Sequence, residues 1–400
     1  MTTSDSHPPL WGLRVLEMGT LIAGPFAARL LAEFGAEVIK IEPPGGGDPL
    51  RQWRKLHQGT SLWWFLQARN KKSVTVDLRR EAGQCIARDL AATADILIEN
   101  FRPGTLEKWG LGWEQLSSLN PGLVMVRISG FGQTGPYRDQ PGFGAIGESI
   151  GGLRFLTGYP DRPPVRVGVS IGDSIAALHG VFGALAALRH RDRTGKGQVV
   201  DVALYEAVFN LMESLLPEYG MFDFVRERTG SALPGIVPSN TYVTRDGKYV
   251  VIGANADSIF KRMMKAIGRD DLAEDPGLAH NDGRVSRTDE IEQVISDWTA
   301  HHDLDEILQV LGDADVPSGN IYDIADIVAD PHYQAREMIQ TRRLKDGQPL
   351  LVPGIVPRLS ETPGATDWLG PDLGEHTAEV LRGLGSDDER INALRADGVI

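Results

Sequence analysis

The sequence is poor in cysteine, in basic residues relative to acidic ones, and in long apolar runs. Its only cysteine is Cys85, so an intramolecular disulfide and a thiolate metal cluster are both excluded. Acidic residues number 54 against 41 lysines and arginines, which gives a formal net charge of -13. Nucleic-acid-binding proteins usually present a basic face, because phosphate contacts dominate their affinity. We therefore expect no nucleic-acid partner, although a local basic pocket for one phosphorylated ligand is compatible with this balance.

The sequence also predicts no targeting segment and no membrane-spanning segment. The first residues, MTTSDSHPPLWG, contain no basic region followed by an apolar run, as a secretory signal would. The apolar runs look too short to span a bilayer. We therefore expect a cytoplasmic protein with no membrane partner.

The composition that remains is that of a globular protein. Hydrophobic residues make up 42% and charged residues 24% of the 400 positions. This length exceeds one ordinary hydrophobic core, so two domains are expected. The changes in pattern predict a large domain over 1–224, a small domain of mixed helix and strand over 225–330, and a segment over 331–400 that returns to the large domain.

Strands and helices alternate in the first half of the chain. An apolar strand, a glycine-containing turn at 19–25, a helix over 26–34 and a second strand over 37–42 form a β-α-β unit. Further strands are predicted at 73–78, 95–98, 124–129 and 199–204, with a helix over 81–92. This alternation predicts an α/β fold with a parallel sheet covered on both faces.

The residues around Asp173 present two interpretations. A short apolar strand beginning at Val165 is predicted to enter Gly172 and Asp173, after a glycine-rich segment over 130–152, and a helix is predicted over 174–190. Asp173 would then lie at a helix N-terminus, where aspartate is a favoured cap. A carboxylate held there, opposite close-lying backbone, could also serve as a nucleophile. The local pattern alone favours the capping role by about two to one.

Other chemical motifs are weaker. The first turn is not G-x-G-x-x-G, and Pro25 removes an amide from it, so a dinucleotide site is not favoured. The string Gly168-Val-Ser-Ile-Gly172 matches a nucleophile elbow, but the predicted helix begins too late for one. His301 and His302 are adjacent and diverge on a helix, so no metal site is predicted. His179, among alanines and leucines, is more typical of a core histidine than of a catalyst.

The order of several motifs resembles the class III CoA-transferases, which include carnitine and bile-acid CoA-transferases and formyl-CoA transferase. The central match is Gly172-Asp173-Ser174, followed by His179. The others follow the family pattern in order along nearly the whole chain: Leu13-Arg-Val-Leu-Glu17, Ala23-Gly-Pro25, Phe34-Gly-Ala-Glu-Val-Ile-Lys-Ile-Glu42, Asn70-Lys-Lys-Ser73, Ala94-Asp-Ile-Leu-Ile-Glu-Asn-Phe-Arg-Pro-Gly104, Ser129-Gly-Phe-Gly-Gln133, Arg193-Thr-Gly-Lys-Gly-Gln198 and Leu373-Gly-Glu-His376.

The resemblance implies a Rossmann-like large domain, a smaller α+β domain, and a homodimer whose two chains interlock like linked rings. It implies that Asp173 attacks an acyl-CoA thioester and carries first an anhydride and then a CoA thioester, without a metal or redox cofactor. Succinyl-CoA as donor and a small carboxylic or dicarboxylic acid as acceptor are the expected substrates by analogy. By position, the segments that contact coenzyme A match Ile22, Ala23, Arg69, Asn70, Lys71, Asn100, Phe101, Arg102, Lys108, Phe143 and Gly144.

Two departures bear on specificity. Ile22 stands where formyl-CoA transferase has a glutamine, and Phe143-Gly144 replaces its tyrosine-glutamate pair. The related α-methylacyl-CoA racemases carry a histidine at the position of Phe143, and racemisation needs two opposed acid-base groups. Transferase activity is therefore favoured over racemase or epimerase activity. A catalytically silent acyl-CoA-binding protein is the third hypothesis.

Overall fold

The structure is a computed structural model that describes residues 7–400. Residues 1–6, part of the N-terminal stretch in which no secretory signal is expected, lie outside the described residues. The chain forms two compact units. Within the described residues, the first comprises 7–154, Val167–Phe224 and Glu337–Ile400, and the second comprises Phe155–Arg166 and Val225–Arg336. The functional domains expected over 1–224, 225–330 and 331–400 stay a prediction.

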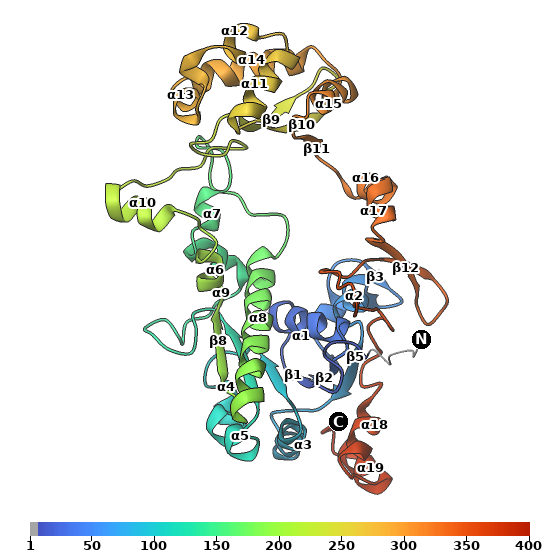
Figure 1. The fold of residues 1–400 in the computed structure, drawn as a ribbon. Helices are drawn as coiled ribbons and strands as arrows, with labels where there is room; N and C mark the ends of the chain where they lie inside the picture. The colour runs from blue at the N-terminus through green and yellow to red at the C-terminus, as the bar shows by residue number, and fades with distance from the viewer. Residues whose placement is uncertain (1–6) are drawn as a thin grey trace. The chain divides into compact units, whose positions relative to one another are not determined.

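The first unit is built on a six-stranded parallel sheet with the order β5-β2-β1-β6-β7-β8 (Figure 1). The strands alternate with helices along the chain, which confirms the predicted α/β class. Numbered by chain position, the strand order is 3-2-1-4-5-6, so the order in which the strands are added reverses between β1 and β6. The strands are β1 (Arg14–Glu17), β2 (Glu37–Glu42), β5 (Lys71–Thr75), β6 (Ile96–Glu99), β7 (Val124–Ser129) and β8 (Val199–Ala203).

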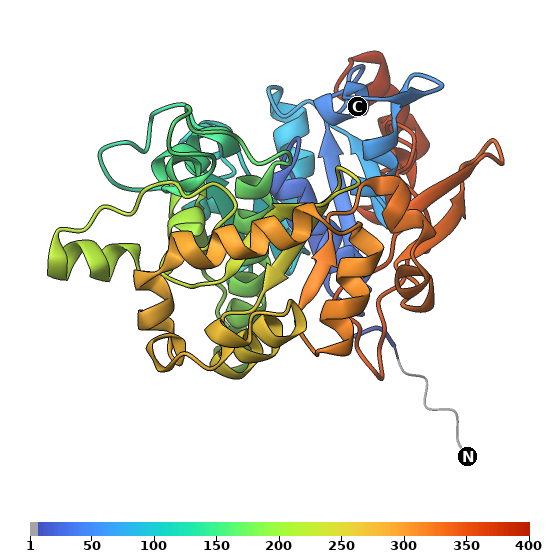
Figure 2. The same cartoon turned by 90° about the horizontal axis from the view of Figure 1, so that it is seen from above.

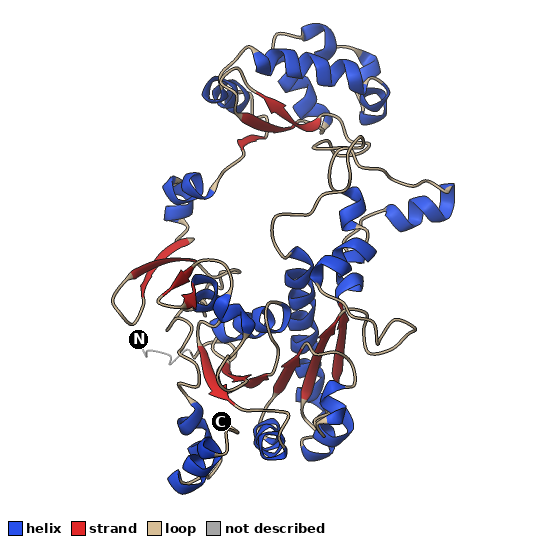
Figure 3. Cartoon of the chain, turned by 180° about the vertical axis from the view of Figure 1, so that it is seen from behind, coloured by secondary structure: helices blue, strands red, loops and turns tan. Residues whose placement is uncertain are grey.

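Helices cover both faces of this sheet, because successive strand residues point to opposite faces. Val15 packs with α1 (Ala23–Glu33), α8 (Ile171–Thr194) and α9 (Leu204–Phe209). Leu16 packs on the other face with α3 (Glu81–Ala92), α4 (Thr105–Lys108), α5 (Trp113–Leu119) and α18 (Thr377–Gly383). Figure 3 shows these helices around the strands.

The remaining elements of the first unit are short. The C-terminal segment packs beside β5, and Figure 2 shows it in red next to the blue strands. The elements are β3 (Leu56–His57), β4 (Thr60–Ser61), α2 (Leu62–Gln67), α6 (Gly144–Ile150), α10 (Leu215–Phe222), β12 (Ile339–Arg343), β13 (Pro349–Pro353), α19 (Asp388–Ala396) and the 3-10 turn η1 (Pro49–Gln52); α7 (Leu153–Leu156) crosses into the second unit.

The second unit has its own core around an antiparallel sheet of order β11-β10-β9. Val250 and Ile252 of β10 are fully buried against Met263 and Ile291. Its elements are β9 (Ser239–Val243), β10 (Tyr249–Gly253), α11 (Asp257–Ala266), α12 (Asp270–Ala273), η2 (Pro276–Leu278), α13 (Asn281–Ser286), α14 (Thr288–Ala300), α15 (Leu304–Asp313), β11 (Ser318–Asn320), α16 (Ile324–Ala329) and α17 (Pro331–Ala335).

Helix α8 is long and apolar enough to cross a bilayer by length and composition, which corrects the expectation that no run reaches that size. A core helix of a globular protein passes the same test. Here α8 packs along α1 and against β7 and β8, and its small residues Ala176, Ala177 and Ala184 are fully buried. We therefore describe α8 as a core helix of the first unit.

Candidate active site

Asp173 lies in the first turn of α8, as its third residue, and Ser170 is the residue that caps the helix. Two predictions are wrong here. The helix begins at Ile171 rather than after Asp173, because the Ser170 carbonyl already accepts the Ser174 amide at 3.2 Å. The strand predicted from Val165 is irregular backbone that pairs with no described strand. A nucleophile elbow needs a strand before the helix, so its absence, rather than the helix start, argues against a hydrolase.

Gly144, the first residue of α6, is packed directly against the carboxylate of Asp173. A Cβ atom at position 144 would lie 2.0 Å from Asp173 Oδ2, so no residue with a side chain fits there without moving the carboxylate. A Cβ atom at Gly172 would in turn lie 3.1 Å from the Gly144 carbonyl oxygen. The structure thus brings together Asp173 and Gly144, two of the residues that the sequence singled out. Phe143, the residue before Gly144, is 69% exposed.

The turn between β1 and α1 holds Ile22 and Ala23 and is fastened to the end of β6. The Asn100 side chain accepts the Thr20 amide at 2.8 Å and donates to the Thr20 carbonyl at 2.9 Å. Helices α1 and α8 run back along parallel strands, so both N-termini lie at the carboxyl edge of the sheet. The carboxyl edge therefore holds the Ile22–Ala23 turn and Asn100 at the point where the strand order reverses, and Asp173 beside that point.

Two buried charged side chains, Lys40 and Asp48, hold the turn between β1 and α1 in place. Lys40 donates to the Gly19 carbonyl at 2.8 Å and pairs with Asp48 at 2.9 Å. Both Asp48 carboxylate oxygens accept the amide of Leu21, whose φ is +66°. A positive φ is strained for leucine, so this ion pair holds the turn in a conformation that leucine alone would not favour.

The turn after β6 presents cations at the same edge. Arg102 and Lys108 are exposed, and Phe101 packs edge-on against Trp109 with ring centroids 5.4 Å apart. The Phe101 amide donates to the buried Glu99 carboxylate at 2.7 Å. Burial raises the pKa of Glu99 to about 7, against the opposing effect of Arg127.

Arg69, Asn70 and Lys71 are buried and bonded within the protein, so the structure does not present them as cations for phosphates. Arg69 donates to Glu33 at 2.7 Å. Lys71 pairs with Glu17 at 2.8 Å and donates to the Pro25 carbonyl, and burial lowers its pKa to about 8. The Asn70 side chain donates to the Ala365 carbonyl and accepts the Asp367 and Trp368 amides.

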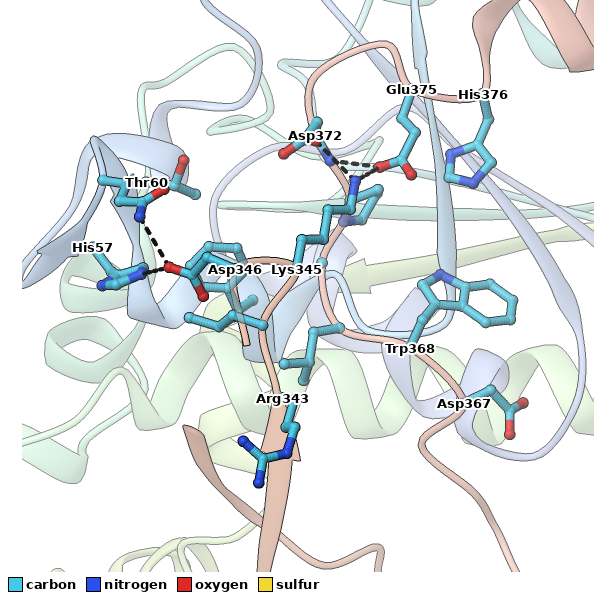
Figure 4. Close-up of a pocket in the computed structure, with 16 residues that line it drawn as sticks. His57, Thr60, Arg343, Lys345, Asp346, Asp367, Trp368, Asp372, Glu375 and His376 are labelled. Carbon is cyan, nitrogen blue, oxygen red and sulfur yellow. Dashed lines mark hydrogen bonds and ion pairs between the residues drawn. The ribbon is translucent and has the colours of Figure 1, made fainter. Parts of the chain in front are cut away.

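The C-terminal segment that Asn70 holds also lines a cavity of about 380 Å³ (Figure 4). Many of its charged side chains are paired with one another: His57 contacts Asp346 at 2.6 Å, and Lys345 bridges Asp372 and Glu375. None of the residues that the sequence assigned to catalysis or coenzyme binding lines this cavity. It is therefore a feature separate from the Asp173 site.

Comparison with known proteins decides the family. Residues 10–377 match the family described as CoA-transferase family III. The chain belongs to CoA-transferase family III.

Named relatives in this family are CoA-transferases. The chain is 52% identical to succinyl-CoA–D-citramalate CoA-transferase of Chloroflexus aurantiacus, with 100% of each chain covered. It is 36% identical to succinate–glutarate CoA-transferase of Agrobacterium fabrum, over 95% of this chain and 96% of the relative. The crystal structure of a CAIB/BAIF family protein from Brucella suis superposes with a TM-score of 0.83, at 35% identity, over 95% of this chain and 100% of that one. These relatives confirm the predicted family and the predicted class of enzyme.

This family III chain also has two charged residues beside Asp173 that the sequence did not single out. Glu148 of α6 is 1% exposed, and its carboxylate accepts the Gly172 amide at 3.4 Å. Arg154 pairs with the other oxygen of Glu148 at 3.2 Å. The two residues are six positions apart across a helix end, a spacing that no helical or strand pattern marks. Only the folded arrangement places them next to the nucleophile candidate.

Proposed function

We propose that this CoA-transferase moves CoA from succinyl-CoA to a small dicarboxylic acid through a covalent intermediate on Asp173. The observation that carries the proposal is the Asp173 carboxylate lying against Gly144, where backbone rather than a side chain borders the nucleophile. The substrate class follows the relatives, which are named as CoA-transferases of D-citramalate, L-malate and glutarate.

The proposed reaction proceeds in four acyl transfers. Asp173 attacks the thioester carbonyl of the donor; the carbon–sulfur bond breaks, and an aspartyl anhydride and CoA thiolate form. The thiolate attacks the aspartyl carbonyl of that anhydride, which releases the donor acid and leaves an aspartyl-CoA thioester. The acceptor carboxylate then attacks this thioester and frees the thiolate again. The thiolate finally attacks the acceptor carbonyl of the new anhydride, giving product acyl-CoA and regenerating Asp173.

We assign coenzyme A to the carboxyl edge of the sheet, so that the large domain acts as a Rossmann-like coenzyme-binding domain. Ligands of open α/β sheets bind where the strand order reverses, which is the position of the Ile22–Ala23 turn and Asn100. Arg102 and Lys108 supply exposed cations for the phosphates. In this proposal Arg69, Asn70 and Lys71 support the scaffold from inside and do not touch the coenzyme.

A homodimer of interlocked chains is part of the proposal. Large apolar side chains remain exposed on α8 at helical spacing, with Leu178 at 53%, Phe182 at 75% and Leu185 at 41%. Exposed apolar surface of this kind is typical of an interface. A second copy of the chain is the occupant that the family resemblance implies. A cytoplasmic location, where acyl-CoA substrates are met, remains our expectation.

The test is a matrix of donors and acceptors read by mass spectrometry. We expect succinyl-CoA with citramalate, malate or glutarate to give the corresponding acyl-CoA and free succinate. Exchange of the α-hydrogen of a 2-methylacyl-CoA for deuterium without any acceptor acid would instead indicate a racemase. Binding of acyl-CoA without acceptor-dependent exchange across the whole matrix would indicate a silent binding protein and overturn the proposal.

A further inference from the structure

We infer that Arg154 is the residue that recognises the distal carboxylate of dicarboxylic acyl groups bound at Asp173, and that Glu148 positions it. The inference rests on the proposed function and deepens it, because it names the residue that selects the acyl group. Glu148 and Arg154 are two opposite charges that lie next to the backbone preceding Asp173.

Arg154 lies close to the backbone that carries Asp173. Asp173 follows Gly172, whose amide donates to Glu148 Oε1 at 3.4 Å, and Arg154 Nη2 lies 3.2 Å from Glu148 Oε2. One carboxylate group therefore separates the guanidinium from the backbone that carries Asp173. All of these residues belong to the first compact unit. A four-carbon acid whose first carboxyl group reacts at Asp173 carries its second carboxyl group a few ångströms away, within the reach of such a cation.

The Arg154 guanidinium has N–H donors that its pair with Glu148 does not use. Among the described residues, its buried Nε–H has no hydrogen-bond partner, and its ion pair with Glu148 is made through Nη2. A guanidinium has five N–H donors in a planar fork that fits a carboxylate with two parallel bonds. A buried donor without a partner costs free energy unless something satisfies it. The side chain is still 29% exposed, so a ligand carboxylate can reach the fork.

Glu148 holds the guanidinium of Arg154 in place. A guanidinium paired with a buried carboxylate keeps one orientation, and a carboxylate that is 1% exposed requires such a partner. Glu148 is therefore a positioning residue, and Arg154 is a specificity-determining residue. Two further arginines are engaged elsewhere: Arg54 lies over the Trp63 ring, and Arg228 donates to the Phe155 and Tyr159 carbonyls.

The test compares acyl-CoA donors with and without a second carboxylate. Succinyl-CoA and butyryl-CoA are each incubated with the enzyme and hydroxylamine, and the rate of trapping at Asp173 is measured by mass spectrometry. In Arg154→Leu we expect the succinyl-CoA to butyryl-CoA ratio of kcat/KM to fall on the order of 100-fold, as for loss of one partner of a charge pair. Butyryl-CoA trapping should be retained or increase. Arg154→Lys should recover part of the ratio, because it keeps the charge without the fork.

Controls separate specificity from folding. Arg382→Gln removes an exposed arginine that pairs with Asp388 and should leave the ratio unchanged. The double variant Glu148→Gln with Arg154→Leu removes both charges of the pair and should show the same loss of ratio. An unchanged ratio in Arg154→Leu, or an equal loss with both donors, would overturn the inference. Failure of the wild-type enzyme to be trapped by any acyl-CoA would instead overturn the proposed function.

Discussion

At the scale of single residues, the proposed active site depends on the lack of a side chain at Gly144 as much as on the carboxylate of Asp173. Asp173 occupies the first turn of α8, where the helix dipole favours a carboxylate, and Gly144 leaves room for its oxygens. A nucleophile must be held in a reactive geometry, and a displacement of about 1 Å can cost on the order of 100-fold in rate. Gly144 is therefore expected to be as sensitive to substitution as a catalytic side chain.

The first prediction concerns Gly144→Ala. A methyl group would lie 2.0 Å from Asp173 Oδ2 and must displace the carboxylate. We expect kcat to fall by on the order of 100-fold, with the fold retained, in a steady-state transfer assay with circular dichroism as the check. Gly312→Ala is the matched control, because Gly312 also lies in a helix and has no atom within 4 Å of the added Cβ. Equal activity in Gly144→Ala and wild type would contradict the site described here.

At the scale of elements, several strands and helices could be predicted from the sequence and some could not. The predicted ranges 37–42, 124–129 and 81–92 coincide with β2, β7 and α3, because each is a buried run or an amphipathic helix with clear ends. The strand predicted at 73–78 is shifted: β5 covers Lys71–Thr75, since its start is set by pairing with Val38 of β2. Register depends on the neighbouring strand, which periodicity does not contain.

The prediction of site residues from the sequence is limited in the same way, because contacts between distant segments are not visible in it. Asp173, Gly144 and the Ile22–Ala23 turn carry motif signals, so the sequence could single them out. Arg69 and Lys71 carry the same signal of positive charge as Arg102, yet they are buried in ion pairs with Glu33 and Glu17. Sequence reveals that a residue is cationic but not which carboxylate the fold places beside it.

The second prediction concerns the end of β6. Burial raises the pKa of Glu99 to about 7, so the native state holds a proton that the unfolded state releases near pH 4.5. The stability from this proton is fully present below pH 4.5 and is lost as the pH rises to about 7. We expect the free energy of unfolding in urea to fall less between pH 4.5 and 7.5 in Glu99→Gln than in wild type. Parallel pH profiles for the two proteins would contradict the assigned pKa.

At the scale of the whole molecule, the chain is an α/β enzyme whose first unit carries every residue that we place in the reaction. The parallel sheet brings the turn after β1, the turn after β6 and the start of α8 to one edge. The proposed second copy of the chain would cover the exposed apolar residues of α8. An interlocked pair has a topological consequence that an ordinary dimer lacks.

The third prediction uses that consequence. Two closed rings that are linked cannot exchange partners unless a chain unfolds. We expect isotopically labelled and unlabelled enzyme, mixed under native conditions, to show no mixed dimers by native mass spectrometry over days, and to form them after joint unfolding and refolding. Phe182→Asp should weaken the dimer, whereas Leu119→Asp, on the exposed end of α5, should not. Rapid exchange in native buffer, or a monomer, would contradict the interlocked arrangement.

The central claim is that Asp173 bonds covalently to its substrate. The most direct measurement incubates the enzyme with succinyl-CoA, traps the intermediate with hydroxylamine, and maps the modified residue by peptide mass spectrometry. The account predicts a hydroxamate at Asp173 that depends on succinyl-CoA, and loss of both the label and turnover in Asp173→Ala. An unlabelled Asp173, together with turnover retained in Asp173→Ala, would contradict it.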